Sequence, residues 1–137
     1  MTRINCVPVE TLTDKHLLAE YKEITRPFNK VIKRIEAGTM DSAVIPKKYC
    51  LGKGHETFFF NKLSWLCRRY YALYRELNNR DFNVNTQQFN EIKYGFYCFF
   101  KETSYWNDWQ PTPEDMYLNM ARLAKRSNLD NVLEELN

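Results

Sequence analysis

The strongest constraint on the fold is a stripe of large apolar residues in the middle of the chain. These residues recur every three or four positions: Phe59, Leu63, Leu66, Tyr70, Leu73 and Leu77. Such spacing places side chains on one face of an α-helix, whereas a half-buried strand would show strict alternation. The stripe is widened by Phe60, Cys67, Tyr71 and Tyr74. The pattern predicts one long core helix from Glu56 to Asn79, with Arg68 and Arg69 facing solvent.

Two helices are predicted before this stripe. The segment from Asp14 to Arg26 has an apolar stripe made of Leu17, Tyr21 and Ile24, and Phe28 just after the segment falls on the same stripe. It should end near Thr25, because a residue that precedes proline is pushed out of the helical region. Pro27 is then well placed to start a second helix, over 28–37, which Gly38 stops.

The C-terminal part predicts one more helix and leaves one region open. Thr112 as N-cap and Pro113 in the first turn favour a helix whose buried side is Met116, Met120 and Leu123. Between 80 and 111 the sequence allows either a helix or strands. An aromatic cluster in that region, made of Tyr105, Trp106 and Trp109, could stack on a base, but we favour a lid that packs on the core.

Length and composition place the chain among globular proteins. Its 137 residues suffice for one domain, 1–137, with a core of its own. We expect a mostly α, compact single-domain protein with three to four main helices and long irregular connections. No apolar run approaches the length of about 20 residues that spans a bilayer, so we expect a cytoplasmic protein with no membrane partner, and a monomer. The four cysteines have no zinc-site spacing, so no metal is expected.

Charge alone does not indicate a partner. The chain has 20 Lys and Arg against 17 Asp and Glu, and nucleic-acid binding depends on how basic residues cluster rather than on this balance. The first helix places His16, Glu20 and Glu23 on one face, with Lys22 and Arg26 beside them. A polar face of this kind is most often simply solvated.

The N-terminus adds a chemical feature to that helix. Thr2 is small, and a small second residue permits removal of Met1, so we expect a mature chain with a free amine on Thr2. The pKa of an α-amine is about 7.7–8.0 against about 10.4 for lysine, so its neutral, nucleophilic form is far more populated near neutral pH. Such an amine beside a carboxylate could attack an aldehyde-like carbon.

Four sequence blocks carry a resemblance to a known family. These blocks are MTRIN at the start, HLLAEYKEI in the first helix, LGKGHETFFFNKL in the middle and ARLAKR near the end. Together they resemble the phage-type pyrimidine-dimer DNA glycosylases with abasic-site lyase activity, also called endonuclease V. The similarity runs from Met1 to about Arg126, and the block from Thr2 to Glu23 is its most specific part.

The resemblance implies a function and a site. In this family the amine of the residue after Met attacks C1′ of the damaged nucleotide, expels the base and forms a Schiff base that undergoes β-elimination. Transferred by position, Thr2 would be the nucleophile and Glu23 the catalytic carboxylate. The DNA or lesion contacts would be Arg3, His16, Lys22, Arg26, Arg122 and Arg126. The partner would be double-stranded DNA with damaged bases or abasic sites, and no cofactor is implied.

The sequence also departs from the family pattern. Lys22 stands where the best-known member has arginine, which keeps the charge but loses the planar, bidentate fork. Arg126 stands where that member has lysine. An aromatic and basic tail associated there with dimer recognition is replaced here by an acidic one. Two alternatives therefore remain open: a DNA-binding module that has kept the fold without catalysis, and an enzyme for a different damaged base.

Overall fold

The structure, a computed structural model, describes residues 1–136 apart from the side chains at positions 129, 130, 132–134 and 136. Its α-helices are α1 (Asp14–Glu23), α2 (Thr25–Glu36), α3 (Leu63–Asn79), α4 (Thr86–Phe100) and α5 (Pro113–Leu136). Short 3-10 helices form at η1 (Val9–Thr11), η2 (Met40–Ser42) and η3 (Thr57–Asn61). No strand occurs between residues 1 and 136. The predicted mostly α fold is confirmed, and the region that the sequence left open forms α4.

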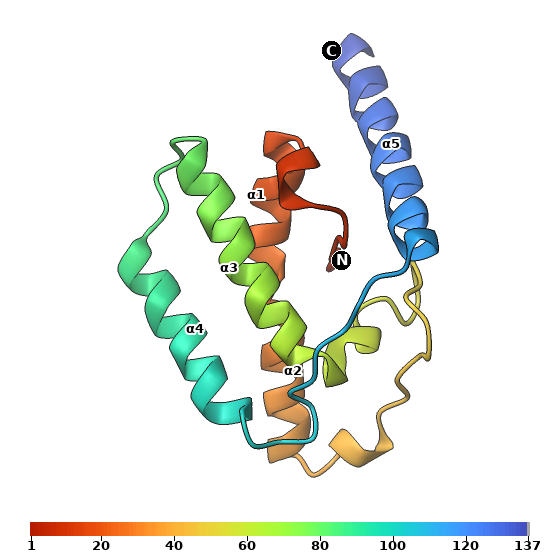
Figure 1. Ribbon diagram of the computed structural model, residues 1–137. Helices are drawn as coiled ribbons and strands as arrows, with labels where there is room; N and C mark the ends of the chain where they lie inside the picture. The colour runs from red at the N-terminus through yellow and green to blue at the C-terminus, as the bar shows by residue number, and fades with distance from the viewer. Residues whose placement is uncertain (137) are drawn as a thin grey trace.

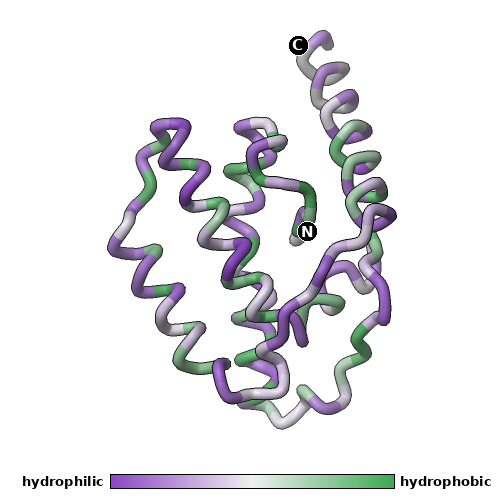
Figure 2. The backbone as a smooth tube through the Cα atoms, in the orientation of Figure 1, coloured by the Kyte–Doolittle hydropathy of each residue, from purple (hydrophilic) through white to green (hydrophobic). Residues whose placement is uncertain are grey.

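Helix α3 is the centre of the molecule (Figure 1). It contacts α1 on one side and α4 on the other, while the N-terminal segment lies between α3 and α5. The predicted stripe faces the core, since Leu63, Leu66, Leu73 and Leu77 are fully buried. Hydrophilic and hydrophobic stretches alternate along the helices, as amphipathic helices require (Figure 2).

The start of α3 differs from the prediction of one helix from Glu56 to Asn79. The segment 57–61 is a 3-10 helix, and Lys62 leaves the helical region with φ −129° and ψ 40° before α3 begins. The first amides of a helix lack partners within it. Here Leu63 N donates to Tyr105 O at 3.1 Å and Trp65 N donates to Asn107 O at 3.3 Å. The break thus depends on a segment 42 residues downstream, which no local pattern reveals.

That downstream segment is the predicted lid. Tyr105, Trp106 and Trp109 are half-buried and pack against the core. The Trp109 ring lies 5.1 Å from the Phe58 ring and 4.9 Å from the Trp65 ring, measured between centroids. The lid packing that the sequence favoured is confirmed.

The helix ends follow local chemistry. Thr13 caps α1, since its side chain accepts from His16 N, and α1 ends at Glu23, close to the predicted Thr25. Helix α2 starts two residues before Pro27, which is tolerated there because first-turn amides have no intrahelical partner. Gly38, with φ 71°, ends α2 as predicted. None of the helices within residues 1–136 is both long and apolar enough to cross a membrane.

The buried side of α5 was predicted in part wrongly. Met116 and Leu123 are half-buried, but Met120 is 52% exposed. The residue next to it, Asn119, is fully buried instead. Helix α5 packs on the polar backbone of the N-terminal segment rather than only on apolar side chains, so an amide occupies the centre of its contact. The acidic tail continues α5 to Leu136, and most of its side chains, with Asn137, lie outside the described residues.

Candidate active site

The N-terminal segment from Thr2 to Val7 runs through the interior without forming a helix or strand. Ile4 is fully buried, Asn5 is 3% exposed and Thr2 is 7% exposed. A buried backbone must find hydrogen-bond partners, and here no sheet or helix supplies them. Side chains from other elements must therefore hold the segment in place.

Three elements supply acceptors for the backbone amides of the segment. Arg3 N donates to Glu23 Oε1 of α1 at 2.9 Å. Ile4 N donates to His55 Nε2 at 2.8 Å, and Cys6 N donates to Asn119 Oδ1 of α5 at 2.6 Å. The segment is thus fixed to α1, to the 51–56 loop and to α5 at once, which sets the position of its first residues.

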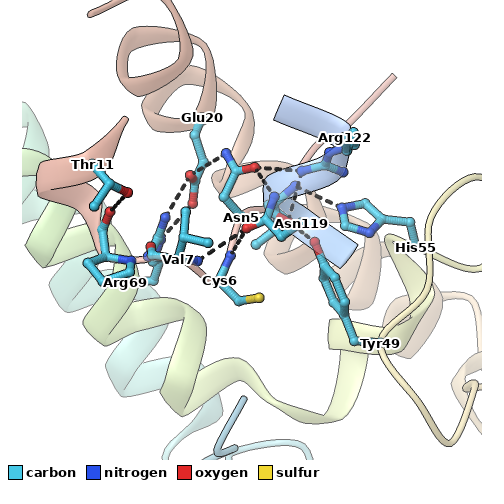
Figure 3. A network of polar contacts seen from close by, with 12 residues as sticks. Asn5, Cys6, Val7, Thr11, Glu20, Tyr49, His55, Arg69, Asn119 and Arg122 are labelled. Atoms are coloured by element: carbon cyan, nitrogen blue, oxygen red, sulfur yellow. Dashed lines mark hydrogen bonds and ion pairs between the residues drawn. The ribbon is translucent and has the colours of Figure 1, made fainter. Parts of the chain in front are cut away.

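An ion pair lies beneath the segment (Figure 3). Arg69 Nε of α3 donates to Glu20 Oε2 at 2.8 Å, and Arg69 Nη2 donates to Glu20 Oε1 at 3.0 Å. The exposed fractions of the two side chains are 7% and 1%. Asn5 Nδ2 also donates to Glu20 Oε1, at 2.8 Å, so the carboxylate is saturated with donors. The prediction that Arg69 faces solvent was wrong, because Glu20 on α1 and the Val7 carbonyl attract it inward.

The Asn5 side chain connects this ion pair to α5 (Figure 3). Its Oδ1 accepts from Asn119 Nδ2 at 2.7 Å and from Arg122 Nη2 at 2.6 Å. Arg122 also reaches Ile4 O at 3.4 Å. A continuous polar network therefore runs from α3 through α1 and the N-terminal segment to α5, and a network whose members are all satisfied rigidifies what it touches.

His55 completes the network as a neutral imidazole. Its Nε2 accepts from Ile4 N, so the proton sits on Nδ1, which lies 2.8 Å from Cys50 O and donates to it. Burial lowers the pKa of His55 from 6.5 to about 4. Tyr49 donates its hydroxyl to Ile4 O at 3.1 Å, and burial raises the pKa of Tyr49 well above its usual value. Both rings therefore act as fixed, uncharged supports.

A cavity of 190 Å³ opens between α1 and α5 beside the N-terminal segment. Five positive or imidazole side chains and two carboxylates lie around it. Its lining includes Arg3, His16, Glu20, Glu23, Arg122 and Arg126, together with Asn5, Lys15, Ala19 and Leu123. The structure therefore brings five of the predicted site residues to one cavity: Arg3, His16, Glu23, Arg122 and Arg126.

Thr2 and Arg26 do not line this cavity but lie next to it, because Arg26 contacts both Thr2 and Glu23, and Glu23 lines the cavity. Arg26 Nη1 lies 3.8 Å from Glu23 Oε1 and 3.4 Å from Thr2 Oγ1. The Glu23 side chain is 14% exposed, so it is sheltered yet reachable from the cavity. Met1 is 84% exposed, and its removal would place the Thr2 amine directly before the residue whose amide Glu23 binds.

Lys22 is the predicted contact that the structure leaves apart. It is exposed on α1 and does not line the cavity. Within the described residues, no group of three or more His, Cys, Asp and Glu side chains could hold a metal ion. The arrangement offers an amine position, a sheltered carboxylate and cationic walls, which suits attack on a carbon of a phosphate-bearing ligand.

Sequence reasoning missed three residues that build this site. Asn5 and Asn119 hold the segment. Glu20 lines the cavity and also neutralises the charge of Arg69. One signal was available: Asn119 lies three residues after Met116 and four before Leu123, so a polar residue interrupts the predicted apolar stripe. An amide at such a position indicates a buried partner.

A comparison with known protein families agrees with this geometry. The family model described as pyrimidine dimer DNA glycosylase matches residues 1–90. The matched part contains the N-terminal segment, α1, His55 and Arg69, whereas α5 and its Asn119 and Arg122 lie beyond it. A match over more than half of the chain, which includes the α1 side of the cavity and the N-terminal segment, shows that this protein belongs to the pyrimidine dimer DNA glycosylase family of DNA repair.

Proposed function

We propose that this glycosylase also cleaves the strand at abasic sites, through a Schiff base formed by the Thr2 amine and assisted by Glu23. Its substrate is a UV-type pyrimidine dimer or a related base lesion in double-stranded DNA. The observation that carries the proposal is the bond from Arg3 N to Glu23 Oε1 at 2.9 Å, beside a cationic cavity. That bond holds a carboxylate one residue away from the nucleophile.

The chemistry needs only these two groups. The neutral Thr2 amine attacks C1′, the C1′–N bond to the base breaks, and the base leaves with a proton. The C1′–N bond to Thr2 becomes an imine as the sugar ring opens. Removal of a C2′ proton then expels the 3′ phosphate. Glu23 stabilises the cationic intermediate and assists that proton transfer, a role worth about 10²–10⁴ in rate.

The basic residues supply DNA binding. Arg3, Arg122 and Arg126 line the cavity, His16 lies with them, and Arg26 bridges Glu23 and Thr2. Guanidinium groups grip phosphates with two bonds each, so they fix the strand as well as attract it. Lys22, exposed in the last turn of α1, adds a longer-range attraction for the DNA backbone.

Lesion preference follows from energetics. Taking a nucleotide out of a duplex costs a few kcal/mol, and the cost is lower where the base is damaged or missing. A small protein with one cationic cavity therefore acts first on sites that are already destabilised. A duplex with one abasic site should be its best substrate, followed by a duplex with one pyrimidine dimer.

The test is strand cleavage by the untagged protein on these two duplexes, with DNA binding measured in parallel. Glu23→Gln should cleave at least about 10²-fold more slowly and bind with little change. Glu10→Gln, an exposed glutamate away from the cavity, is the matched control and should behave like the wild type. Wild-type cleavage by Glu23→Gln would overturn the catalytic assignment, and binding without any cleavage by the wild type would indicate a non-catalytic DNA-binding module.

A further inference from the structure

The outer face formed by α3 and α4 exposes an unusual number of aromatic rings. It lies on the side of α3 opposite to α5 and the N-terminal segment (Figure 1). The exposed fractions are 69% for Tyr94, 44% for Tyr97 and 42% for Tyr71. Large rings in such a group usually mark a binding surface, whereas single exposed rings need no explanation.

Cations accompany these rings. Lys93 Nζ, on α4, lies 5.4 Å from the centroid of the Tyr71 ring on α3. Arg75 Cζ, one turn after Tyr71 on α3, lies 5.9 Å from the same centroid. Lys101 Nζ lies 5.5 Å from the centroid of the Tyr97 ring. Tyr71 and Tyr97 thus each have a positive charge over the ring, and Tyr94 is the most exposed of the three rings.

A groove of 510 Å³ runs between the two helices. It is lined by Cys67, Asn90, Lys93, Tyr94 and Tyr97, none of which is acidic. The carboxylate of α4, Glu91, borders a different cavity, on the α2 side, with Gly95 and Phe99. The groove side of α4 therefore carries only positive charge, and it is complementary to a polyanion.

We propose that the α3–α4 groove binds a single strand of DNA, with bases stacked on Tyr94 and Tyr97 and phosphates held by Lys93, Arg75 and Lys101. Lys93, Tyr94 and Tyr97 line the groove, and Arg75 and Lys101 lie over neighbouring tyrosine rings. Exposed aromatic rings with cations close by are the combination that single strands need. Paired bases in a duplex offer no free face to such rings. A phosphate-only contact would not require the tyrosines.

This site is separate from the proposed chemistry. The family match ends at residue 90, so Lys93, Tyr94, Tyr97 and Lys101 lie outside it. No residue of the groove lines the cavity between α1 and α5. An undamaged single strand can therefore be tested whether or not the Schiff-base proposal holds.

The first test measures binding of a fluorescent oligothymidine to the full chain by anisotropy. Tyr94→Ala should weaken binding at least about fivefold, because one stacked base contributes about 1–3 kcal/mol. Lys93→Ala should lower the slope of log affinity against log salt by about 0.7. Tyr117→Ala removes a tyrosine that is 73% exposed on α5 and should leave binding unchanged. Urea unfolding checks that each variant is folded.

The second test locates the strand. Cys98 is exposed and lies one turn from Tyr94 on α4, whereas Cys6 and Cys67 are buried. Alkylation of Cys98 by a maleimide, followed by mass spectrometry, should be slowed by the oligothymidine and not by an undamaged duplex of equal length. Equal protection by the duplex, no protection at all, or binding that Tyr94→Ala leaves unchanged would overturn the proposal.

Discussion

The two sides of α3 are built on opposite principles. On the cavity side, charged and amide groups are buried, and each of Asn5, Glu20, Arg69 and Asn119 depends on named partners. On the α4 side, aromatic rings stack: Tyr74 lies on Phe89 at 4.0 Å between centroids. Polar networks are directional and fail when one partner is lost, whereas ring packing tolerates changes of shape. Side-chain positions are therefore fixed most tightly on the side where we propose the chemistry.

The largest expected loss of stability comes from a substitution in the buried network on the cavity side. Glu20→Ala leaves the Arg69 guanidinium buried without its partner, which should lower the free energy of unfolding by about 3–5 kcal/mol. Urea unfolding measures this loss.

A neighbouring pair provides the control. Arg68 pairs with Asp108 at the surface, where both side chains are 63% exposed. Asp108→Ala should therefore lower stability by less than about 1 kcal/mol. Similar losses in Glu20→Ala and Asp108→Ala would contradict the view that the buried network fixes the cavity side.

The second effect is a pH dependence confined to the cavity side. In the folded protein the pKa of His55 is lowered from 6.5 to about 4 by burial. Between these values the unfolded chain binds a proton that the folded chain does not bind, so stability is full above pH 6.5 and falls as the pH drops towards about 4. The total loss should be about 3 kcal/mol.

Urea unfolding over this pH range measures the slope. His55→Gln should remove the His55 contribution to it, whatever the stability of that variant at neutral pH. His16→Gln, which changes the other histidine of the chain, should retain it. An unchanged slope in His55→Gln would show that other groups cause the pH dependence.

The third effect is smaller and belongs to the α4 side. Phe89→Leu keeps an apolar side chain of similar size but loses the ring contacts with Tyr74 and Tyr70. We expect a loss of about 1 kcal/mol, with the same value at pH 7 and at about pH 5. A loss as large as that of Glu20→Ala would remove the contrast between the two sides.

The smallest expected change in stability comes from the link between α3 and α4. Asp81 has φ 63° and ends α3 in a Schellman motif, in which Phe82 N donates to Leu77 O at 3.0 Å. Glycine adopts this conformation without strain, so Asp81→Gly should raise stability by about 0.5 kcal/mol. Gly38→Asp, at the equivalent position after α2, is the reverse change and should lower it. A thermal melt of both variants checks the two signs.

The same contrast explains what the sequence could predict. Periodicity located α3, because Leu63, Leu66, Leu73 and Leu77 form a regular stripe. Cap residues located the end of α2 and the start of α5. Tertiary hydrogen bonds have no such period. The start of α3 is set by carbonyls of Tyr105 and Asn107, and Arg69 is buried because Glu20 faces it from another helix.

The chemistry of the N-terminus suggested the Thr2 amine, but the full candidate site was predicted only through the matching sequence blocks. Most of the residues predicted from those blocks line one cavity, and Thr2 and Arg26 lie beside it. Lys22 is exposed and does not line it. The residues that hold the N-terminal segment, Asn5 and Asn119, are far apart in sequence and carry no charge, so neither motif nor composition pointed to their contact.

The most direct test of the central claim is borohydride trapping on a duplex with one abasic site, with the modified residue identified by mass spectrometry. The account predicts a stable adduct on the Thr2 amine of chains that have lost Met1, and none on chains blocked at the N-terminus by acetylation. The competing amines are those of the lysines: Lys15 lines the cavity, and burial lowers the pKa of Lys62 to about 8. An adduct on Lys62, or on any other lysine of a correctly processed chain, would contradict the assignment of Thr2 as the nucleophile.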